Sequence, residues 1–252
     1  MNERGMIFNG EMVRAILDGR KTQTRRVMKP QPDPCPAPRG GHWWPSNVFK
    51  TMLHVEEEMQ NGKGGWGGLV GDVCPFGDVG DRIWVRETWA TLGNEDGCCV
   101  DWNDNLCKGD EKTAARIYRA SCEQRPGDYG LWSIPDNADW KPHTENQKFE
   151  GAWRPSIHMP RWASRITLEI TDVRVERLHS ISERDALREG LFQLPASGRY
   201  CLQPGMQYFG MASSSAKEVY SWLWASIYGE ESWAANPWVW VIEFKRVEGG
   251  AA

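Results

Sequence analysis

Gly19-Arg20-Lys21-Thr22-Gln23-Thr24-Arg25-Arg26 places one lysine, two threonine hydroxyls and three arginines in eight consecutive residues. A short helix is predicted just before it, over residues 11–18, because four apolar side chains share one face there: Met12, Val13, Ile16 and Leu17. Gly19 suits the left-handed backbone position that commonly ends a helix. We therefore expect the stretch to leave a tight corner and to run into an extended segment.

The composition is that of a globular protein. Of its 252 residues, 40% are hydrophobic and 25% are charged, which suffices to bury a core in one elaborated domain or two small ones. We expect a single domain over residues 1–252. The sequence has no apolar run long enough to span a bilayer and no signal-peptide core, which predicts a cytoplasmic protein without a membrane partner.

Charge limits how this protein can contact nucleic acid. The formal net charge is −4, so such contact needs a local basic patch. Between residues 14 and 29, Asp18 is the only acid among six cations: Arg14, Arg20, Lys21, Arg25, Arg26 and Lys29. This segment predicts either a solvated basic surface or a patch that contacts phosphates.

A second basic stretch, residues 153–165, mixes three arginines with two tryptophans. It predicts either a nucleic-acid patch or a basic loop whose tryptophans pack onto the core. The two interpretations are about equally supported by the pattern.

Seven cysteines without a CxxC pair argue against a disulfide framework. Four of them lie close enough in sequence to raise the question of zinc: Cys98, Cys99, Cys107 and Cys122. Their spacing fits no common ligand pattern, so we expect reduced thiols, no metal and no cofactor.

Alternating apolar residues predict strands over 82–89, 116–120, 166–175 and 238–245. A slip in the alternation at Thr171-Asp172 predicts one bulge in the longest of them. With short helices between the strands, the pattern predicts an α+β fold, a small β-barrel with flanking helices. Long loop insertions are expected at about 30–79 and 90–152, the first of them a lid or a decoration.

Two helices are predicted in the C-terminal half. Ser182 and Asp185 form a capping pair for a short helix that runs through Glu189 and stops at Gly190. Ser213 or Ser214 is expected to cap a later helix that ends before Gly229.

These features resemble the ASCH domain, which has a PUA-like β-barrel fold. The resemblance rests on the motif after the first helix, on Gly80-Asp81 leading a strand, on the capped helix and on the final strand from Trp238. It covers roughly residues 5–29, 80–90, 115–120 and 153–247. The chain also resembles the larger ASCH proteins of phages and prophages, which share the Arg-Glu-Thr-Trp strand at 86–89 and the 153–162 stretch.

Within that family, small bacterial N4-acetylcytidine amidohydrolases carry the motif Gly-Arg-Lys-Thr-x-Thr-x-Arg, which Gly19 to Arg26 matches. The resemblance implies that Lys21 and Thr24 are catalytic. Aligning the later helix by its start places the family's catalytic glutamate on Glu189. The small enzymes have nothing like the two insertions, which therefore either reshape the pocket for another substrate or close it.

The implied activity is hydrolysis of an N-acyl group on a modified nucleoside such as N4-acetylcytidine. It needs an activated hydroxyl and a lysine whose pKa falls well below about 10.4, through burial or nearby positive charge. Lys21 and Thr24 are three residues apart, so an extended strand would direct them to opposite faces, and they converge only if the chain turns tightly after Gly19. Glu189 would shuttle the proton or hydrogen-bond the cytosine amine, and the sequence leaves open whether Glu87 takes the acid role instead. Trp84, Trp89 or Trp162 would stack on the cytosine base.

Substrate or nucleic-acid contacts are expected from eight residues: Arg20, Arg25, Arg26, Trp84, Glu87, Arg161, Trp162 and Arg165. The first alternative to the enzyme is an RNA-binding module of PUA-like type, in which these arginines and Lys21 hold phosphates without any reaction. The second is an ASCH ribonuclease that uses the same lysine and threonine.

Overall fold

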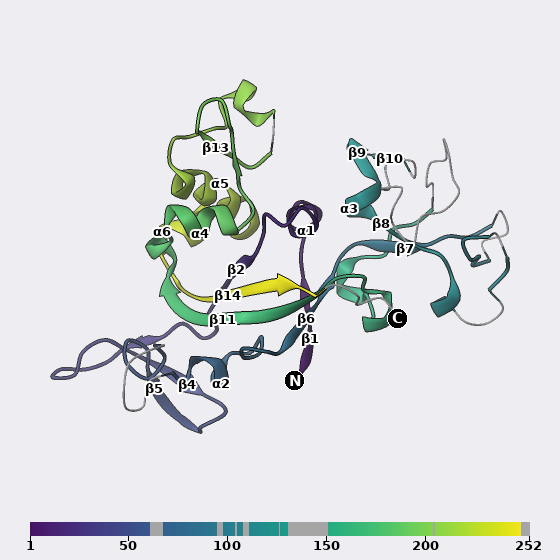
Figure 1. Ribbon diagram of the computed structural model, residues 1–252. Coiled ribbons are helices and arrows are strands. Elements are labelled where there is room, and N and C mark those ends of the chain that lie inside the picture. The colour runs from purple at the N-terminus through teal and green to yellow at the C-terminus, as the bar shows by residue number, and fades with distance from the viewer. Residues whose placement is uncertain are drawn as a thin grey trace. The chain divides into compact units, whose positions relative to one another are not determined.

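The computed structural model describes residues 1–60, 68–94, 98–103, 105–107, 111–125, 127–130, 151–203 and 205–247 (Figure 1). They form two compact units, each built from segments that are distant in the sequence. The first unit comprises 1–4, 15–83 and 168–247, and the second comprises 5–14 and 84–167, each within the described ranges. Parts of both predicted insertions, among them 61–67 and 131–150, lie outside the described residues. The prediction of one domain over 1–252 stays a prediction.

The largest described sheet has five strands in the order β1-β6-β11-β14-β2. Their bounds are Glu3–Ile7 (β1), Gln23–Val27 (β2), Arg82–Arg86 (β6), Thr167–Arg177 (β11) and Trp238–Arg246 (β14). β14 pairs antiparallel with both β11 and β2, and a register shift between Ile170 and Asp172 confirms the predicted bulge. The presence of both strands and helices confirms the α+β class. β1 and β2 stand at the two ends of the strand order, so closure of the sheet into a barrel stays a prediction.

The first unit adds short strands and most of the helices. Its other strands are β3 (Asp33–Pro34), β4 (His42–Ser46), β5 (Thr51–His54), β12 (Phe192–Gln193) and β13 (Tyr200–Cys201). Its helices are α2 (Val70–Val73), α4 (Glu183–Arg188), α5 (Ala216–Tyr228) and α6 (Glu230–Ala234), with 3-10 turns η5 (Leu178–Ser180) and η6 (Met206–Phe209). α1 (Gly10–Leu17) is divided between the units.

The two faces of β14 have different partners. Because strand side chains alternate, Val239 and Val241 lie on one face and Trp238, Trp240 and Ile242 on the other. The two valines belong to a buried cluster with residues of α4 and α5, including Ala186, Ala216, Val219, Tyr220 and Trp224. Figure 1 shows α4 and α5 on one side of β11 and β14. This packing fixes the end of α4 over the sheet.

The predicted first insertion is more ordered than a loop. Residues 33–54 form a three-stranded antiparallel sheet in the order β3-β4-β5. Trp44 of β4 is 6% exposed and meets Trp240 edge-on, with ring centroids 5.5 Å apart. The expectation of a long loop here is corrected: paired strands form because alternate residues of β4 have the apolar face of β14 to pack against.

The helix ends follow local capping chemistry. Asn9 Oδ1 accepts a hydrogen bond from the backbone N–H of Met12 at 2.9 Å, which begins α1. The Oγ of Ser182 accepts from the backbone N–H of Asp185 at 3.1 Å, so the predicted cap of α4 is confirmed. The cap predicted for α5 is wrong by one or two residues. Ser215 takes that place and accepts from the backbone N–H of Glu218.

The second unit is built from short elements. They are β7 (Trp89–Thr91), η1 (Glu111–Thr113), β8 (Arg116–Tyr118), α3 (Arg119–Cys122), β9 (Glu123–Arg125), β10 (Asp128–Tyr129), η3 (Ser156–His158) and η4 (Arg161–Ala163). β7 pairs antiparallel with β8. Trp89 and Tyr118 are buried with Met159 and Ala163, so the 153–165 stretch contributes two residues to this core.

Two sequence expectations concern membranes and metals. None of the helices in the described part of the chain is both long and apolar enough to cross a membrane. Within the same residues, His, Cys, Asp and Glu side chains form no group of three or more that could hold a metal ion. Among the four cysteines considered for zinc, Cys98 is exposed and Cys122 is buried, and burial raises the pKa of the Cys122 thiol to about 11.

The contact between β4 and β14 is testable by truncation. Trp44→Ala should lower the free energy of unfolding by about 3–5 kcal/mol, since it removes a buried indole from the face of the sheet. Val48→Ala, at a residue that is 59% exposed, is the control and should change it by less than about 0.5 kcal/mol. Urea unfolding followed by circular dichroism measures both. Equal effects would show that the insertion does not pack on the sheet.

Candidate active site around Lys21 and Glu189

The corner after α1 positions Lys21. Gly19 has φ +74°, the left-handed conformation predicted for it. The backbone N–H of Lys21 donates to the carbonyl of Ala15 at 2.9 Å, and Lys21 then pairs with Glu189 in an isolated antiparallel β-bridge. The N–H of Thr22 donates to the carbonyl of Arg188 at 2.9 Å. The chain therefore turns before Lys21 and is extended from Lys21 onward.

The Lys21 amine is bound to the residue after α4. Its Nζ donates to Glu189 Oε2 at 2.7 Å and to the Glu189 carbonyl at 2.9 Å. The exposed fraction of the side chain is 0% for Lys21 and 3% for Glu189. The other carboxylate oxygen of Glu189 accepts from Arg25 Nη1 at 3.2 Å. One buried carboxylate thus joins two cations.

Further ion pairs extend from this triad along the sheet. Arg25 Nη2 lies 3.1 Å from Glu176 Oε2 and 3.6 Å from Asp185 Oδ2. With its amide turned so that the nitrogen donates to Asp185, Gln23 accepts from Arg25. Acids and bases then alternate through three more pairs: Arg174–Glu176 at 2.6 Å, Arg174–Glu243 at 2.7 Å and Arg188–Glu243 at 2.9 Å. Each buried charge in this network has a partner of opposite sign, as burial requires.

Burial dominates the electrostatics of Lys21. Desolvation lowers the pKa of its amine from the usual 10.5, and the nearby charges of Arg26 and Arg25 lower it further, whereas Glu189 raises it. The net effect is a pKa of Lys21 below its usual value. Tyr220 of α5 is also buried, and burial followed by the charge of Glu189 raises the pKa of its phenol well above 10.0. Lys21 is therefore easier to deprotonate than a surface lysine, and Tyr220 stays a neutral phenol.

Thr24 lies on the other face of β2. Gln23 and Arg25 share a face of β2, and Arg25 and Lys21 both bind Glu189, so Thr24, between Gln23 and Arg25, faces away. Thr24 pairs with Ile242 and is buried, 1% exposed. A Lys21–Thr24 pair would need a turn between the two residues. The turn at Gly19 comes before both, so the structure brings Lys21 together with Glu189 and Arg25 and not with Thr24.

Glu87 and Arg165 form a separate pair within the second unit. Arg165 donates from Nε and Nη2 to the two Glu87 oxygens, at 2.9 and 3.0 Å. Its guanidinium carbon lies 4.1 Å from the centroid of the Tyr118 ring. Glu87 is 2% exposed, and the Arg165 side chain is 9% exposed. Both oxygens of the Glu87 carboxylate thus accept from Arg165, and a bidentate charge-assisted pair of this kind fixes the geometry of both side chains.

The remaining predicted contact residues of the second unit also have packing partners. Trp84 lies so close to Gly5 that a Cβ there would be 2.6 Å from its Cζ2. Trp162 meets Trp89 edge-on with centroids 5.5 Å apart. Arg161 donates to Thr167 Oγ1 at 3.3 Å. These contacts favour the core-packing interpretation of the 153–165 stretch over the base-stacking one.

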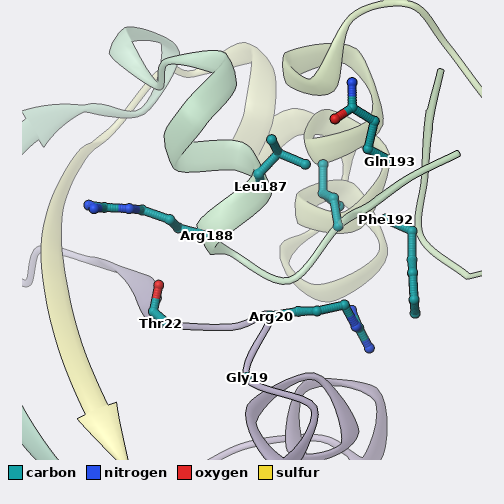
Figure 2. A pocket seen from close by; sticks show the side chains of 8 residues that line it. Gly19, Arg20, Thr22, Leu187, Arg188, Phe192 and Gln193 are labelled. Carbon is teal, nitrogen blue, oxygen red and sulfur yellow. The ribbon is translucent and has the colours of Figure 1, made fainter. Parts of the chain in front are cut away.

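A pocket of about 440 Å³ opens beside the Lys21–Glu189 bridge (Figure 2). Lys21, Thr24 and Glu189 are not among the residues that line it, which are Gly19, Arg20, Thr22, Leu187, Arg188, Leu191, Phe192 and Gln193. Figure 2 shows Arg20 beside Phe192, with Thr22 and Arg188 further along the pocket. Sequence reasoning found Arg20 and missed the other polar residues. Thr22 lies next to Lys21 in the motif, so side-chain alternation along that segment was the signal that could have found it.

Comparison with known proteins adds no relative: no family model, no curated protein and no solved structure matches the chain. The resemblance to the ASCH domain therefore rests on the sequence features alone.

The central ion pair can be tested by removing one charge. Glu189→Gln should lower the free energy of unfolding by about 3–5 kcal/mol, because it leaves Lys21 and Arg25 buried beside a neutral amide. The control is Glu169→Gln, which removes a pair with Lys245, whose side chain is 63% exposed, and should cost at most about 1 kcal/mol. Urea unfolding at neutral pH measures both. Equal losses would mean that the buried pair is worth no more than a surface one.

Proposed function

We propose that this protein hydrolyses an N-acyl amide on a modified nucleoside, of which N4-acetylcytidine is the model substrate. The contact that carries the proposal is the one between the Lys21 amine and the Glu189 carboxylate, at 2.7 Å. It joins the lysine of the Gly19–Arg26 motif to the glutamate that the ASCH resemblance pairs with it, across 168 residues of sequence. The proposal includes a PUA-like fold, with the described sheet as part of the barrel.

The proposed chemistry uses Lys21 as the base. Burial lowers its pKa, which favours the neutral amine that can accept a proton. A water molecule adds to the acyl carbon and gives its proton to Nζ. The C–N bond then breaks, the exocyclic amine of the nucleobase leaves with that proton, and acetic acid is released, which ionises to acetate by giving its proton to solvent. Glu189 holds the ammonium form of Lys21 between the two proton transfers, and Arg25 fixes the carboxylate.

Water replaces Thr24 as the proposed nucleophile, because Thr24 lies on the opposite face of β2 from Arg25. The Lys21 side chain has no exposed surface in this conformation, so turnover requires a neighbouring segment to move. Gly190 packs on its stem: a Cβ added there would lie 3.3 Å from Lys21 Cβ. The left-handed Gly190, at φ +108°, gives this segment a residue whose backbone has freedom to change.

A second candidate is binding without reaction, as an RNA-binding module would do. The observation that favours it is the pocket itself, which is lined by Arg20 and Arg188 but by none of the three residues assigned to catalysis. The two candidates differ in what Lys21 does. A catalytic Lys21 controls turnover, whereas binding at the pocket depends on the arginines.

The proposal predicts release of cytidine and acetate when the purified protein is incubated with N4-acetylcytidine, followed by liquid chromatography. Lys21→Met should reduce the rate by at least about 100-fold, because the proton acceptor is lost. Thr24→Val should keep most of it. Lys245→Met, at a residue with a 63% exposed side chain, is the control and should keep the full rate. The rate should rise with pH as Lys21 loses its proton, at a pH below the usual 10.5.

Circular dichroism should show that each variant is folded. If the folded wild-type protein releases no cytidine, the hydrolase proposal fails. Loss of the rate in Thr24→Val together with an active Lys21→Met would overturn the assignment of roles.

A further inference from the structure

Two of the cysteines considered for zinc lie opposite each other in the second unit. Val100 and Leu106 form an isolated antiparallel bridge. One residue away from that bridge, the backbone N–H of Cys107 donates to the carbonyl of Cys99 at 2.9 Å. Residues that are directly opposed in an antiparallel pair point to the same face. The side chains of Cys99 and Cys107 therefore share one face.

The separation of the two cysteines suits a disulfide. On the other side of the bridge, the N–H of Asp101 donates to the carbonyl of Asn105 at 2.9 Å, so Cys99 and Cys107 occupy a hydrogen-bonded position of the pair. The Cα atoms in such a position are about 5.5 Å apart. Disulfides span Cα separations of about 4.4–6.8 Å, so the two sulfurs can meet without a change of register.

Both thiols can turn toward each other. They are free and partly exposed. The Sγ of Cys99 lies 3.7 Å from Thr91 Oγ1, and the Sγ of Cys107 lies 3.9 Å from the carbonyl oxygen of Asn105. A thiol is a weak hydrogen-bond donor, so leaving these contacts costs little. Gly93, which opposes Cys99 on its other side, adds no side chain to the shared face.

Two other thiols of the second unit are less suited to pair with Cys107. Cys98 is exposed, but alternation along the extended segment directs it to the face opposite to that of Cys99. Cys122 is buried, and burial raises the pKa of its thiol to about 11, so it keeps the proton that a nucleophilic thiol must lose. Cys99 and Cys107 thus combine access to solvent with a partner on the same face.

We propose that Cys99 and Cys107 form a redox-sensitive pair, which a small disulfide such as glutathione disulfide oxidises to an intramolecular disulfide. The thiolate of one cysteine attacks a sulfur of glutathione disulfide, whose S–S bond breaks and releases one glutathione. The thiolate of the opposed cysteine then attacks the protein sulfur of this mixed disulfide and releases the second glutathione. The two thiols lose two electrons to the small disulfide, and their two protons end on the two glutathione molecules.

The resulting bond is expected to be reversible. The Cβ atoms of opposed strand residues lie about 4.5–5.5 Å apart, whereas a disulfide holds them at about 3.5–4.5 Å. Forming the bond therefore draws the two segments together, and a strained bond in a partly exposed position is readily reduced. The inference is independent of the proposed function, because it uses no residue of the site around Lys21.

Peptide mapping tests the pair. The reduced full chain is incubated with glutathione disulfide, and the remaining thiols are then alkylated in denaturant. One peptide should link Cys99 to Cys107, and dithiothreitol should remove the link. In the folded protein this link should exceed a Cys98–Cys107 link by at least about 10-fold, because alternation turns Cys98 away. The same reaction in urea should lose that preference.

Cys99→Ala and Cys107→Ala each remove one partner. Neither should form the link, and in at least one of them the remaining cysteine should retain glutathione as a mixed disulfide, because no opposed thiolate displaces it. Cys98→Ala is the matched control and should form the Cys99–Cys107 bond at the wild-type rate. Circular dichroism should show that the three variants are folded.

Absence of the Cys99–Cys107 peptide from the oxidised, folded wild-type protein would overturn the proposal. Equal yields of the Cys99–Cys107 and Cys98–Cys107 links would do the same, since the strand register would then not select the pair. If neither single variant retained glutathione, the route through a mixed disulfide would be wrong.

Discussion

The described fold of the first unit depends on how three buried charges are accommodated. Lys21, Glu189 and Arg25 are almost wholly removed from water, and an isolated charge in that position would cost several kcal/mol. The cost is offset only if the carboxylate meets both cations at hydrogen-bond distance. This requirement fixes the residue after α4 against the start of β2. Two segments that are far apart in the sequence are thereby held in one register.

The apolar core supports the same arrangement. α4 and α5 pack on Val239 and Val241 of β14, which places the end of α4 over β2. One face of the sheet therefore has two regions. One is apolar and lies under the helices, and the other is polar and carries the ion-pair network. The other face, with Trp240 and Thr24, is packed against the strands of the first insertion at Trp44. Among the described residues of the insertion, Trp44 thus packs on the face of the sheet opposite to the one that carries Lys21.

The sequence predicted the features that depend on local chemistry. The left-handed Gly19, the Ser182 cap and the bulge near Thr171 each follow from a few adjacent residues, and the structure has all three. Glu189 was placed by resemblance, and it does lie at the Lys21 amine. The face on which Thr24 lies was left open, because it depends on whether the turn comes before or after Lys21. Strand alternation supplies that answer only once the first extended residue is known.

Other features needed long-range information. Glu87 and Arg165 form an ion pair although they are 78 residues apart in the sequence. Hydrophobic periodicity does not predict a pair of this kind. The three strands of the first insertion form where a proline-rich composition suggested a loop, because a tryptophan-bearing face of the sheet was available to cover. The pocket lies beside the motif and is lined in part by residues after α4, which composition alone does not bring to Arg20.

The proposed role of Lys21 depends on the protonation of its amine. NMR titration of the Lys21 side chain, assigned by comparison with Lys21→Met, measures it in the folded protein. If burial outweighs the attraction of Glu189, the midpoint lies below the value of about 10.4 for an exposed lysine. A midpoint at or above that value would show that the ion pair dominates. Lys21 would then be a fixed cation, and its role as a base would be contradicted.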